Sequence, residues 1–185
     1  MKTSLFDSVN RELELNLPDC ETMDEYLDVI LEKIAPFSED LYESENYIGT
    51  RWIEVRETET FHESVLHIFN DTSEYMLVID GNIQKGQWRF LTENNSFILE
   101  YLGRSELFDL AFLNEDFFIL RKHGDQARKG NQKYFVLGRE NHVRSLTWLE
   151  VMDLLFNIHR KSSRFMIMIV AAFILAAIVI GLSIR

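Results

Sequence analysis

Histidine side chains are the first candidates for chemistry in this chain, because they bind metals and transfer protons near neutral pH. The sequence holds five of them, namely His62, His67, His123, His142 and His159. No H-E-x-x-H motif and no cysteine–histidine spacing of a zinc site occurs among them. His62 and His67 are five residues apart, which places them on opposite faces of a flat strand. We therefore expect each histidine to be exposed and unpaired, and we predict no metal and no other cofactor.

Nucleophilic and carboxylate chemistry also lack a recognisable motif. A nucleophilic serine or cysteine needs an adjacent base that is itself oriented, and no G-x-S-x-G motif occurs. The single cysteine, Cys20, excludes an internal disulfide, and we interpret it as a small residue at the entry of a helix. The adjacent acids Glu39-Asp40 and Glu115-Asp116 lack the glycine-punctuated spacing of a calcium loop. We predict that the protein is not an enzyme; a hydrolase that uses two convergent carboxylates is an open alternative.

The segment HGDQARKGNQK at residues 123–133 combines two glycines with several basic residues. It lacks the G-x-x-x-x-G-K-[ST] spacing of a P-loop and does not open a helix, so it predicts no nucleotide site. As a long hairpin loop it would bring basic side chains to lipid headgroups or to an acidic partner, and a solvated loop is the alternative interpretation. The candidate membrane-facing residues of this loop and its flanks are Arg121, Lys122, Arg128, Lys129 and Lys133.

The elements that must position these groups begin with a helix. Residues 20–34 carry an apolar stripe at spacings of three and four, which is typical of an amphipathic helix. Asp19 is expected to cap its start, and Pro36 follows its end. The stretch 38–48 is then predicted as an acidic connector. Together with the helix it would form the outward face of the protein.

Residues 50–138 have the composition of a β domain, in which short runs rich in Val, Ile, Phe, Tyr and Trp alternate with polar turn sequences. Asp80-Gly81 and Asn94-Asn95 suit tight hairpin turns with positive φ. Sequential short strands predict an antiparallel meander, and about eight strands suffice to close a small barrel or to wrap as a strongly bent sheet. The candidate strands are 50–57, 61–69, 74–79, 83–91, 96–102, 106–112, 116–122 and 133–138.

A second helix is predicted over residues 148–160, after a capping box formed by Thr147 and Glu150. With it, the fold class is α+β and mainly β: a meander with one flanking helix on each side. We expect residues 1–160 to form one domain.

The segment 165–184 is uncharged and apolar on every side. As a helix it spans about 30 Å, which matches the hydrocarbon thickness of a bilayer, and a buried core helix is the alternative. The positive-inside rule places the basic link at 161–164, and the domain before it, in the cytoplasm. On these features the chain resembles single-pass, tail-anchored membrane proteins, and the resemblance implies contact with anionic lipid headgroups. The candidate membrane-facing residues beside the segment are Arg160, Lys161 and Arg164.

Small residues at spacings of four within 165–184 suit close packing against another helix. The pairs fall on different faces of the segment, and a homo-oligomer is compatible with either pair. The candidates for helix–helix contact are Ala172, Ala176, Ala177 and Gly181.

The net charge of −11 is distributed unevenly along the chain. Residues 1–60 carry a net charge of −11, residues 61–120 carry −7, and residues 121–185 carry +7. Lys and Arg near an anionic leaflet each contribute about 1 kcal/mol of attraction. We therefore expect a basic face toward the membrane and an acidic face away from it, with ordinary solvated charge as the alternative. The acidic bulk would repel phosphates, so no nucleic-acid partner is expected.

The tripeptide Gly86-Gln87-Trp88, followed by a run of short strands, resembles the G-x-W signature of the lipocalins. That resemblance implies a barrel over residues 49–138 in which the tryptophan closes the floor and an apolar ligand occupies the interior. In lipocalins the motif lies on the first barrel strand, whereas here two or three candidate strands precede it. Trp52 is better placed, but Gly49 lies one residue too far from it.

Two functional hypotheses follow. The main one is a membrane-tethered, non-enzymatic scaffold with a cytoplasmic β-rich domain and an unidentified protein partner. The alternative is a lipocalin-like barrel that binds a lipid or another apolar ligand at the membrane surface. That alternative needs a cavity, whereas the abundance of large aromatic residues favours a filled interior.

Overall fold

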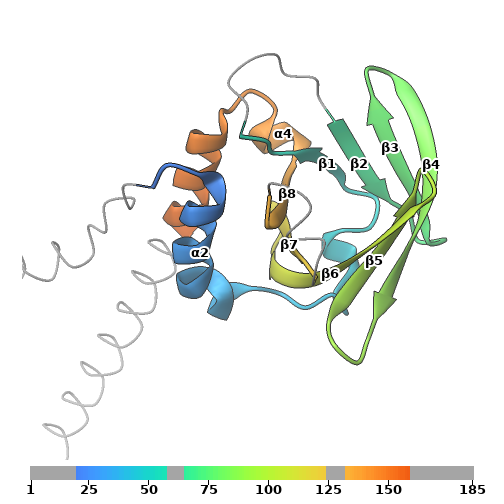
Figure 1. Ribbon diagram of the computed structural model, residues 1–185, viewed down its shortest axis with the longest axis horizontal. Coiled ribbons are helices and arrows are strands. Elements are labelled where there is room, and N and C mark those ends of the chain that lie inside the picture. The colour runs from blue at the N-terminus through green and yellow to red at the C-terminus, as the bar shows by residue number, and fades with distance from the viewer. Residues whose placement is uncertain (1–19, 58–64, 124–131, 159–185) are drawn as a thin grey trace, which may run out of the picture.

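Eight antiparallel strands close into a barrel in the computed structural model, which describes residues 20–57, 65–123 and 132–158 (Figure 1). The strands are Arg51–Glu54 (β1), Val65–Phe69 (β2), Glu74–Ile79 (β3), Asn82–Leu91 (β4), Ser96–Tyr101 (β5), Arg104–Leu113 (β6), Phe117–Lys122 (β7) and Tyr134–Arg139 (β8). Each strand pairs with its neighbours in sequence, and β8 pairs with β1, so no edge of the sheet is left open. The predicted antiparallel meander is confirmed, and the chain adopts its closed form.

Tight turns with positive φ connect several of the hairpins, as the sequence predicts. Asp80 and Gly81, with φ of 48° and 82°, join β3 to β4, and Asn95, with φ of 50°, lies before β5. Short polar side chains and glycine tolerate this conformation well. Leu102, with φ of 52° before Gly103, occupies the same conformation between β5 and β6 without that advantage.

Side chains alternate between the two faces of the barrel wall, and this separates two apolar cores. The interior core gathers the inward-facing residues, among them Trp52, Phe69, Trp88, Phe97 and Phe118. The second core lies outside the barrel, where the outward-facing residues of β1, β7 and β8 meet the helices. Part of the wall is therefore buried on both faces. That explains why the strand at Phe117–Lys122 begins with four consecutive buried residues.

The predicted apolar stripe of the first helix is confirmed in α2 (Met23–Ile34), whose six buried residues face the outer core. The helix begins later than expected, because Thr22 caps it and accepts a hydrogen bond from the Glu25 N–H at 3.3 Å. Asp19, the cap that we predicted, lies outside the described residues. A 3-10 turn, η1 (Ala35–Phe37), follows α2 and contains Pro36.

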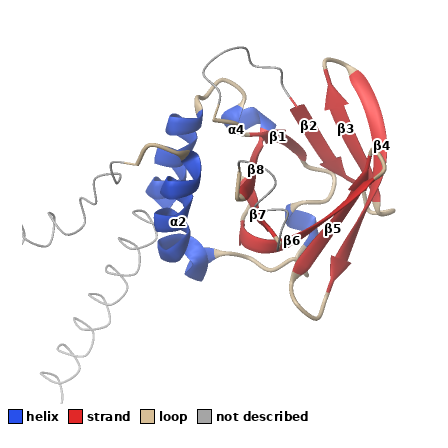
Figure 2. Ribbon diagram, in the orientation of Figure 1, coloured by secondary structure: helices blue, strands red, loops and turns tan. Residues whose placement is uncertain are grey.

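The second predicted helix is present at residues 148–158, the last that the structure describes. The capping box is confirmed: Glu150 accepts from the Thr147 N–H at 2.7 Å, and its own N–H donates to Thr147 Oγ1 at 3.4 Å. This helix and α2 lie together along one side of the barrel (Figure 2), and the rings of Tyr26 and Trp148 meet edge to face between them. A short helix that we did not predict, α4 (Glu140–Val143), packs Val143 against Gly138 of β8.

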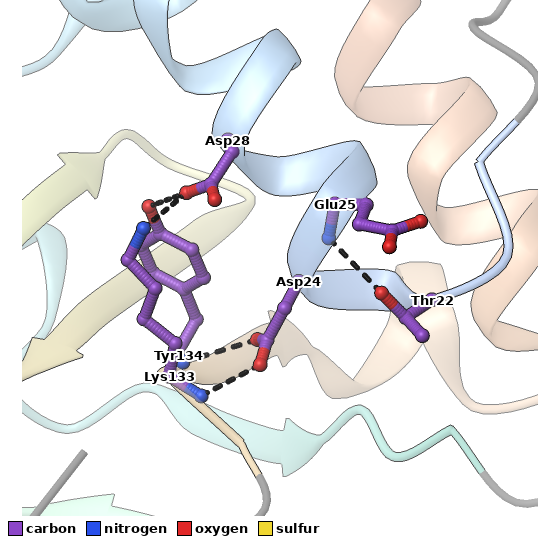
Figure 3. Close-up of polar contacts among 6 residues, drawn as sticks. All are labelled: Thr22, Asp24, Glu25, Asp28, Lys133 and Tyr134. Atoms are coloured by element: carbon purple, nitrogen blue, oxygen red, sulfur yellow. Dashed lines mark hydrogen bonds and ion pairs between the residues drawn. The ribbon is translucent and has the colours of Figure 1, made fainter. Parts of the chain in front are cut away.

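Two aspartates fasten α2 to the start of β8 (Figure 3). Asp24 accepts hydrogen bonds from the backbone N–H groups of Lys133 and Tyr134, at 2.8 and 3.3 Å. Asp28, one helical turn further on, accepts from Lys133 Nζ at 2.5 Å and from the Tyr134 hydroxyl at 2.6 Å. Burial raises the pKa of Asp28, but these hydrogen bonds outweigh it and hold the pKa below its usual value. The helix is thus held by an apolar stripe and by polar contacts beside it.

The connector after α2 corrects one prediction. We expected residues 38–48 to form part of an outward face, but they fold across one end of the barrel through η2 (Ser44–Asn46). Leu41 and Tyr47 are each 1% exposed and belong to the interior core. The prediction rested on the acidic residues of this segment. Its two large apolar residues are buried, and their burial stabilises the closed end.

The predicted membrane class is also corrected. Within residues 20–57, 65–123 and 132–158, no helix is long and apolar enough to cross a membrane. The helices there are amphipathic, with charged residues such as Glu25 and Asp153 on their exposed faces. The resemblance to tail-anchored proteins is therefore not supported, and the fold class reduces to a barrel with flanking helices. The predicted link at 161–164 and the apolar segment 165–184 lie outside the described residues, and the cytoplasmic location stays a prediction.

Candidate functional site

One end of the barrel interior is closed by aromatic packing around Tyr47. Its ring stacks on Phe118 with centroids 5.4 Å apart and meets Trp88 and Phe97 edge to face. The Tyr47 hydroxyl donates to the Leu41 carbonyl at 3.0 Å. The backbone carbonyl of Tyr47 accepts from the indole N–H of Trp52 at 3.2 Å. Burial raises the pKa of Tyr47 to about 12. The closed end is therefore filled by side chains and has its polar groups satisfied.

The G-x-W tripeptide lies inside the barrel, but on the fourth strand. Trp88 stacks on Phe97 at 5.4 Å and donates its indole N–H to the Asn70 carbonyl at 2.9 Å, so it belongs to the closed end. A Cβ at Gly86 would lie 2.3 Å from the Glu100 carbonyl oxygen and 3.0 Å from the ring of Tyr75. Position 86 therefore requires glycine, because neighbouring atoms approach too closely for a side chain. This packing requirement explains the glycine without the lipocalin signature.

Three hydrogen-bonded residues, Glu54, His67 and Tyr75, lie inside the barrel next to the closed end, and we call them the relay. His67, on β2, contacts the Tyr75 hydroxyl through Nδ1 at 2.6 Å and the Glu54 carboxylate through Nε2 at 3.3 Å. Arg56 donates to the same Glu54 oxygen at 2.8 Å. Because a carboxylate only accepts, His67 Nε2 is the donor in the contact with Glu54. The strands β1, β2 and β3 each contribute one member, so the relay depends on their register.

The relay is buried and strongly polarised. His67 is 4% exposed and Tyr75 is 0% exposed. Burial raises the pKa of the Glu54 carboxyl, but hydrogen bonds from His67 and Arg56 outweigh it and lower the pKa to about 2. The pKa of Tyr75 is raised far above its usual value by burial and by the nearby Tyr101 and Glu54. At neutral pH the relay therefore holds a charged carboxylate and a neutral phenol.

Beyond the relay, the interior is less densely covered, and we call this half the mouth. Its inward-facing residues Gln84, Tyr101, Glu106 and Phe135 are all partly exposed. The Tyr101 ring packs edge to face on Tyr75 at 5.7 Å, which joins the mouth to the relay. The strand connections after Ile79 and after Tyr101 lie at this end of the barrel. The mouth is thus a partly open, mixed aromatic and polar surface with the relay as its floor.

The expectation of exposed, unpaired histidines is wrong for His67, which is buried, and holds only in part for His123 and His142, which are exposed but paired. His67 is the centre of the relay, His123 lies 3.2 Å from Asp109, and His142 lies 2.6 Å from Asp116. His62 and His159 lie outside the described residues. A signal for His67 was present in the run VLHIF, where every neighbour is apolar, because a histidine in such a strand must find its partners in other strands.

The predicted basic residues are distributed over β7 and β8. Arg121 is exposed and lies 3.6 Å from Asp109, Lys133 is bonded to Asp28, and Lys122 is partly buried at the end of β7. Their predicted contact with lipid headgroups stays a prediction. The remaining candidates lie outside the described residues: Arg128, Lys129, Arg160, Lys161, Arg164, Ala172, Ala176, Ala177 and Gly181.

An outer groove of about 530 Å³ runs between α2 and the barrel wall. Asp28 and Glu32 line it on the helix side, and Arg121 and Lys133 line it on the barrel side. Two of these charges already pair with each other, Asp28 with Lys133. Among the described residues, no group of three or more His, Cys, Asp or Glu side chains is arranged to hold a metal ion.

Comparisons of the chain with protein-family models, with curated proteins and with solved structures gave no match. The likeness to lipocalins therefore extends only to the closed, eight-stranded, up-and-down barrel. The positions of both tryptophan motifs and the buried relay are features of this chain.

Proposed function

We propose that this protein is a non-enzymatic binding module whose barrel mouth takes a small ligand with an apolar body and one polar group. The observation that carries the proposal is the Glu54–His67–Tyr75 relay, held in place within an aromatic interior. Ligand sites are typically apolar concavities with a few well-placed polar groups. The mouth combines such a relay with Tyr101 and Phe135, which are partly exposed and therefore reachable.

The filled closed end limits where a ligand can lie. Tyr47, Trp88 and Phe118 fill this end of the barrel interior and leave no room there for a large apolar ligand. The ligand of this barrel is therefore small and lies in the mouth. The alternative of a ligand-binding barrel is retained in this narrower form, and the membrane-tethered scaffold is not.

The geometry of the relay favours binding over catalysis. A general acid or base must come within hydrogen-bond reach of a reacting atom. Tyr75 and His67 are almost completely buried, and each already bonds to another member of the relay. The relay is therefore suited to hold the mouth in one arrangement, and the absence of enzymatic activity stays part of this proposal.

Nuclear magnetic resonance titration with 1-decanol tests the proposal. We expect saturable shift changes at Gln84, Tyr101 and Phe135, and affinity reduced at least about fivefold by Tyr101→Ala. The matched control is Tyr42→Ala, an exposed tyrosine at the opposite end of the barrel. Absence of saturable binding would overturn the proposal, as would changes confined to the groove between α2 and the barrel.

A further inference from the structure

We propose that the polar group of the ligand is a protonated amine, which Glu106 binds at the mouth together with Tyr101 and Gln84. This inference rests on the proposed function and adds the chemical class of the ligand. An apolar primary amine, alkyl or arylalkyl, is the class that fits.

Glu106 supplies the negative charge. It lies directly opposite Leu99 in the β5–β6 pair and two residues before Phe108, and both of these belong to the interior core. Because residues opposite each other in a pair face the same way, Glu106 also points into the barrel. Within the described residues its carboxylate has no hydrogen-bond or ion-pair partner, although it is partly buried. A partly buried carboxylate without a partner favours a cationic ligand.

Gln84 adds an unsatisfied acceptor on the same surface. It pairs with Leu77 of the interior core and therefore faces inward, two residues before Gly86. Its Oε1 atom is buried and has no hydrogen-bond partner among the described residues. A buried acceptor that lacks a donor destabilises the folded protein, and a ligand N–H group would satisfy it.

Tyr101 completes the constellation and joins it to the relay. Its ring meets Tyr75 at 5.7 Å, and the Tyr75 ring and the Tyr101 Cβ flank the position that Gly86 leaves without a side chain. Burial raises the pKa of Tyr101, Glu106 and Glu54 raise it further, and Arg104 and Arg56 lower it; the net shift is upward, so the hydroxyl stays neutral beside the negative charge of Glu106. Aromatic faces beside a negative field attract ammonium groups through cation–π interaction.

The positive charges of the mouth do not cancel this preference. Arg56 is exposed and already bonds to Glu54, and Arg104 is exposed opposite Tyr101. Both guanidinium groups are exposed to solvent, whereas the Glu106 carboxylate and Gln84 Oε1 have no partner among the described residues. An ammonium supplies three donors and one positive charge, whereas a carboxylate supplies neither.

Three probes of equal chain length test the inference: decylamine, 1-decanol and decanoate, each titrated calorimetrically into the full chain at neutral pH and low salt. We expect decylamine to bind about tenfold more tightly than decanol, since a hydrogen bond to a charged group contributes about 1.5–3 kcal/mol. Decanoate should bind most weakly. Glu106→Gln should remove the preference for the amine, so that decylamine and decanol bind with similar affinities.

Glu100→Gln is the matched control, because Glu100 lies on β5 but faces outward and pairs with Arg89. It should leave all three affinities unchanged, and circular dichroism should show both variants folded. Equal binding of amine and alcohol, or an amine preference that survives Glu106→Gln, would overturn the inference while leaving the proposed function intact. Failure of all three probes to bind would overturn both.

Discussion

The closed end and the mouth of this barrel are built by the same strands, yet they differ in what their inward residues do. At the closed end, Tyr47 is surrounded by large rings, and its hydroxyl and carbonyl both have hydrogen-bond partners. At the mouth, Gln84 and Glu106 face the same interior without partners among the described residues. The polar groups of the closed end are satisfied within the protein, whereas those of the mouth are the groups to which we propose that a ligand binds.

This difference shows that the residues that stabilise a small barrel can be concentrated at one end of its interior. Dense aromatic packing supplies the favourable burial energy, and it does not need to be spread evenly along the interior. The relay of Glu54, His67 and Tyr75 lies between the two ends and fixes the position of Tyr101 through ring contact. Variants at the two ends should therefore affect different properties of the molecule.

The largest effect is expected for Tyr47→Ala at the closed end. Removing this ring leaves a cavity among Phe118, Trp88 and Phe97 and should cost about 3–5 kcal/mol of unfolding free energy, as measured in urea. Tyr42→Ala is the control, because Tyr42 is 62% exposed in the same connector, and it should cost less than about 1 kcal/mol. A similar loss for both variants would show that the closed end is not the stabilising region.

Next in size is the pH dependence that Glu54 imposes on stability. Its pKa falls from 4.5 to about 2 on folding, so its contribution is fully present above pH 4.5 and is lost as the pH falls toward 2. We expect Glu54→Gln to be less stable than the unaltered protein by on the order of 2–3 kcal/mol at pH 7. In urea unfolding the gap should narrow at pH 3, and a gap independent of pH would contradict the charged state of the relay.

Gly86→Ala should act at the boundary between the two ends. The added Cβ would lie 2.3 Å from the Glu100 carbonyl and would press on Tyr75 and Tyr101, so we expect a loss of about 1–3 kcal/mol in thermal or urea unfolding. Decylamine binding should weaken as well, because both rings move. Unchanged binding in a destabilised variant would place the ligand away from these rings.

The smallest effect on stability is expected for Tyr101→Phe, at the mouth. The Tyr101 hydroxyl has no hydrogen-bond partner among the described residues, so unfolding free energy should change by less than about 0.5 kcal/mol. Calorimetry should nevertheless show weaker binding of decylamine than in the unaltered protein. A substantial loss of stability would instead make this end structural, as the closed end is.

Local patterns explain how much of the fold was predictable. The runs of β-branched and aromatic residues, together with Asp80-Gly81, placed the strands and one hairpin. The stripe of α2 and the box of Thr147 and Glu150 placed the helices, because both depend on residues within one or two turns. The tail-anchored class is not supported, because no helix within the described residues is long and apolar enough to cross a membrane and the segment 165–184, on which the prediction rested, lies outside them.

The candidate site was not predictable in the same way. His67 meets Glu54 and Tyr75 only because three strands align in one register, and no spacing in the sequence encodes those contacts. The inward direction of Glu106 likewise depends on its pairing with Leu99. A shift of one residue in either pair would turn these side chains to the other face.

The sequence by itself determined the elements of this protein: the strands, the turns and the two amphipathic helices, whose signals are short-range alternation, helical period and capping. Only the tertiary structure decided that the sheet closes, that Tyr47 fills one end, and that Glu54, His67 and Tyr75 meet below the mouth. The physical reason is that closure and register are set by packing between residues far apart in the chain, where local propensity has no influence.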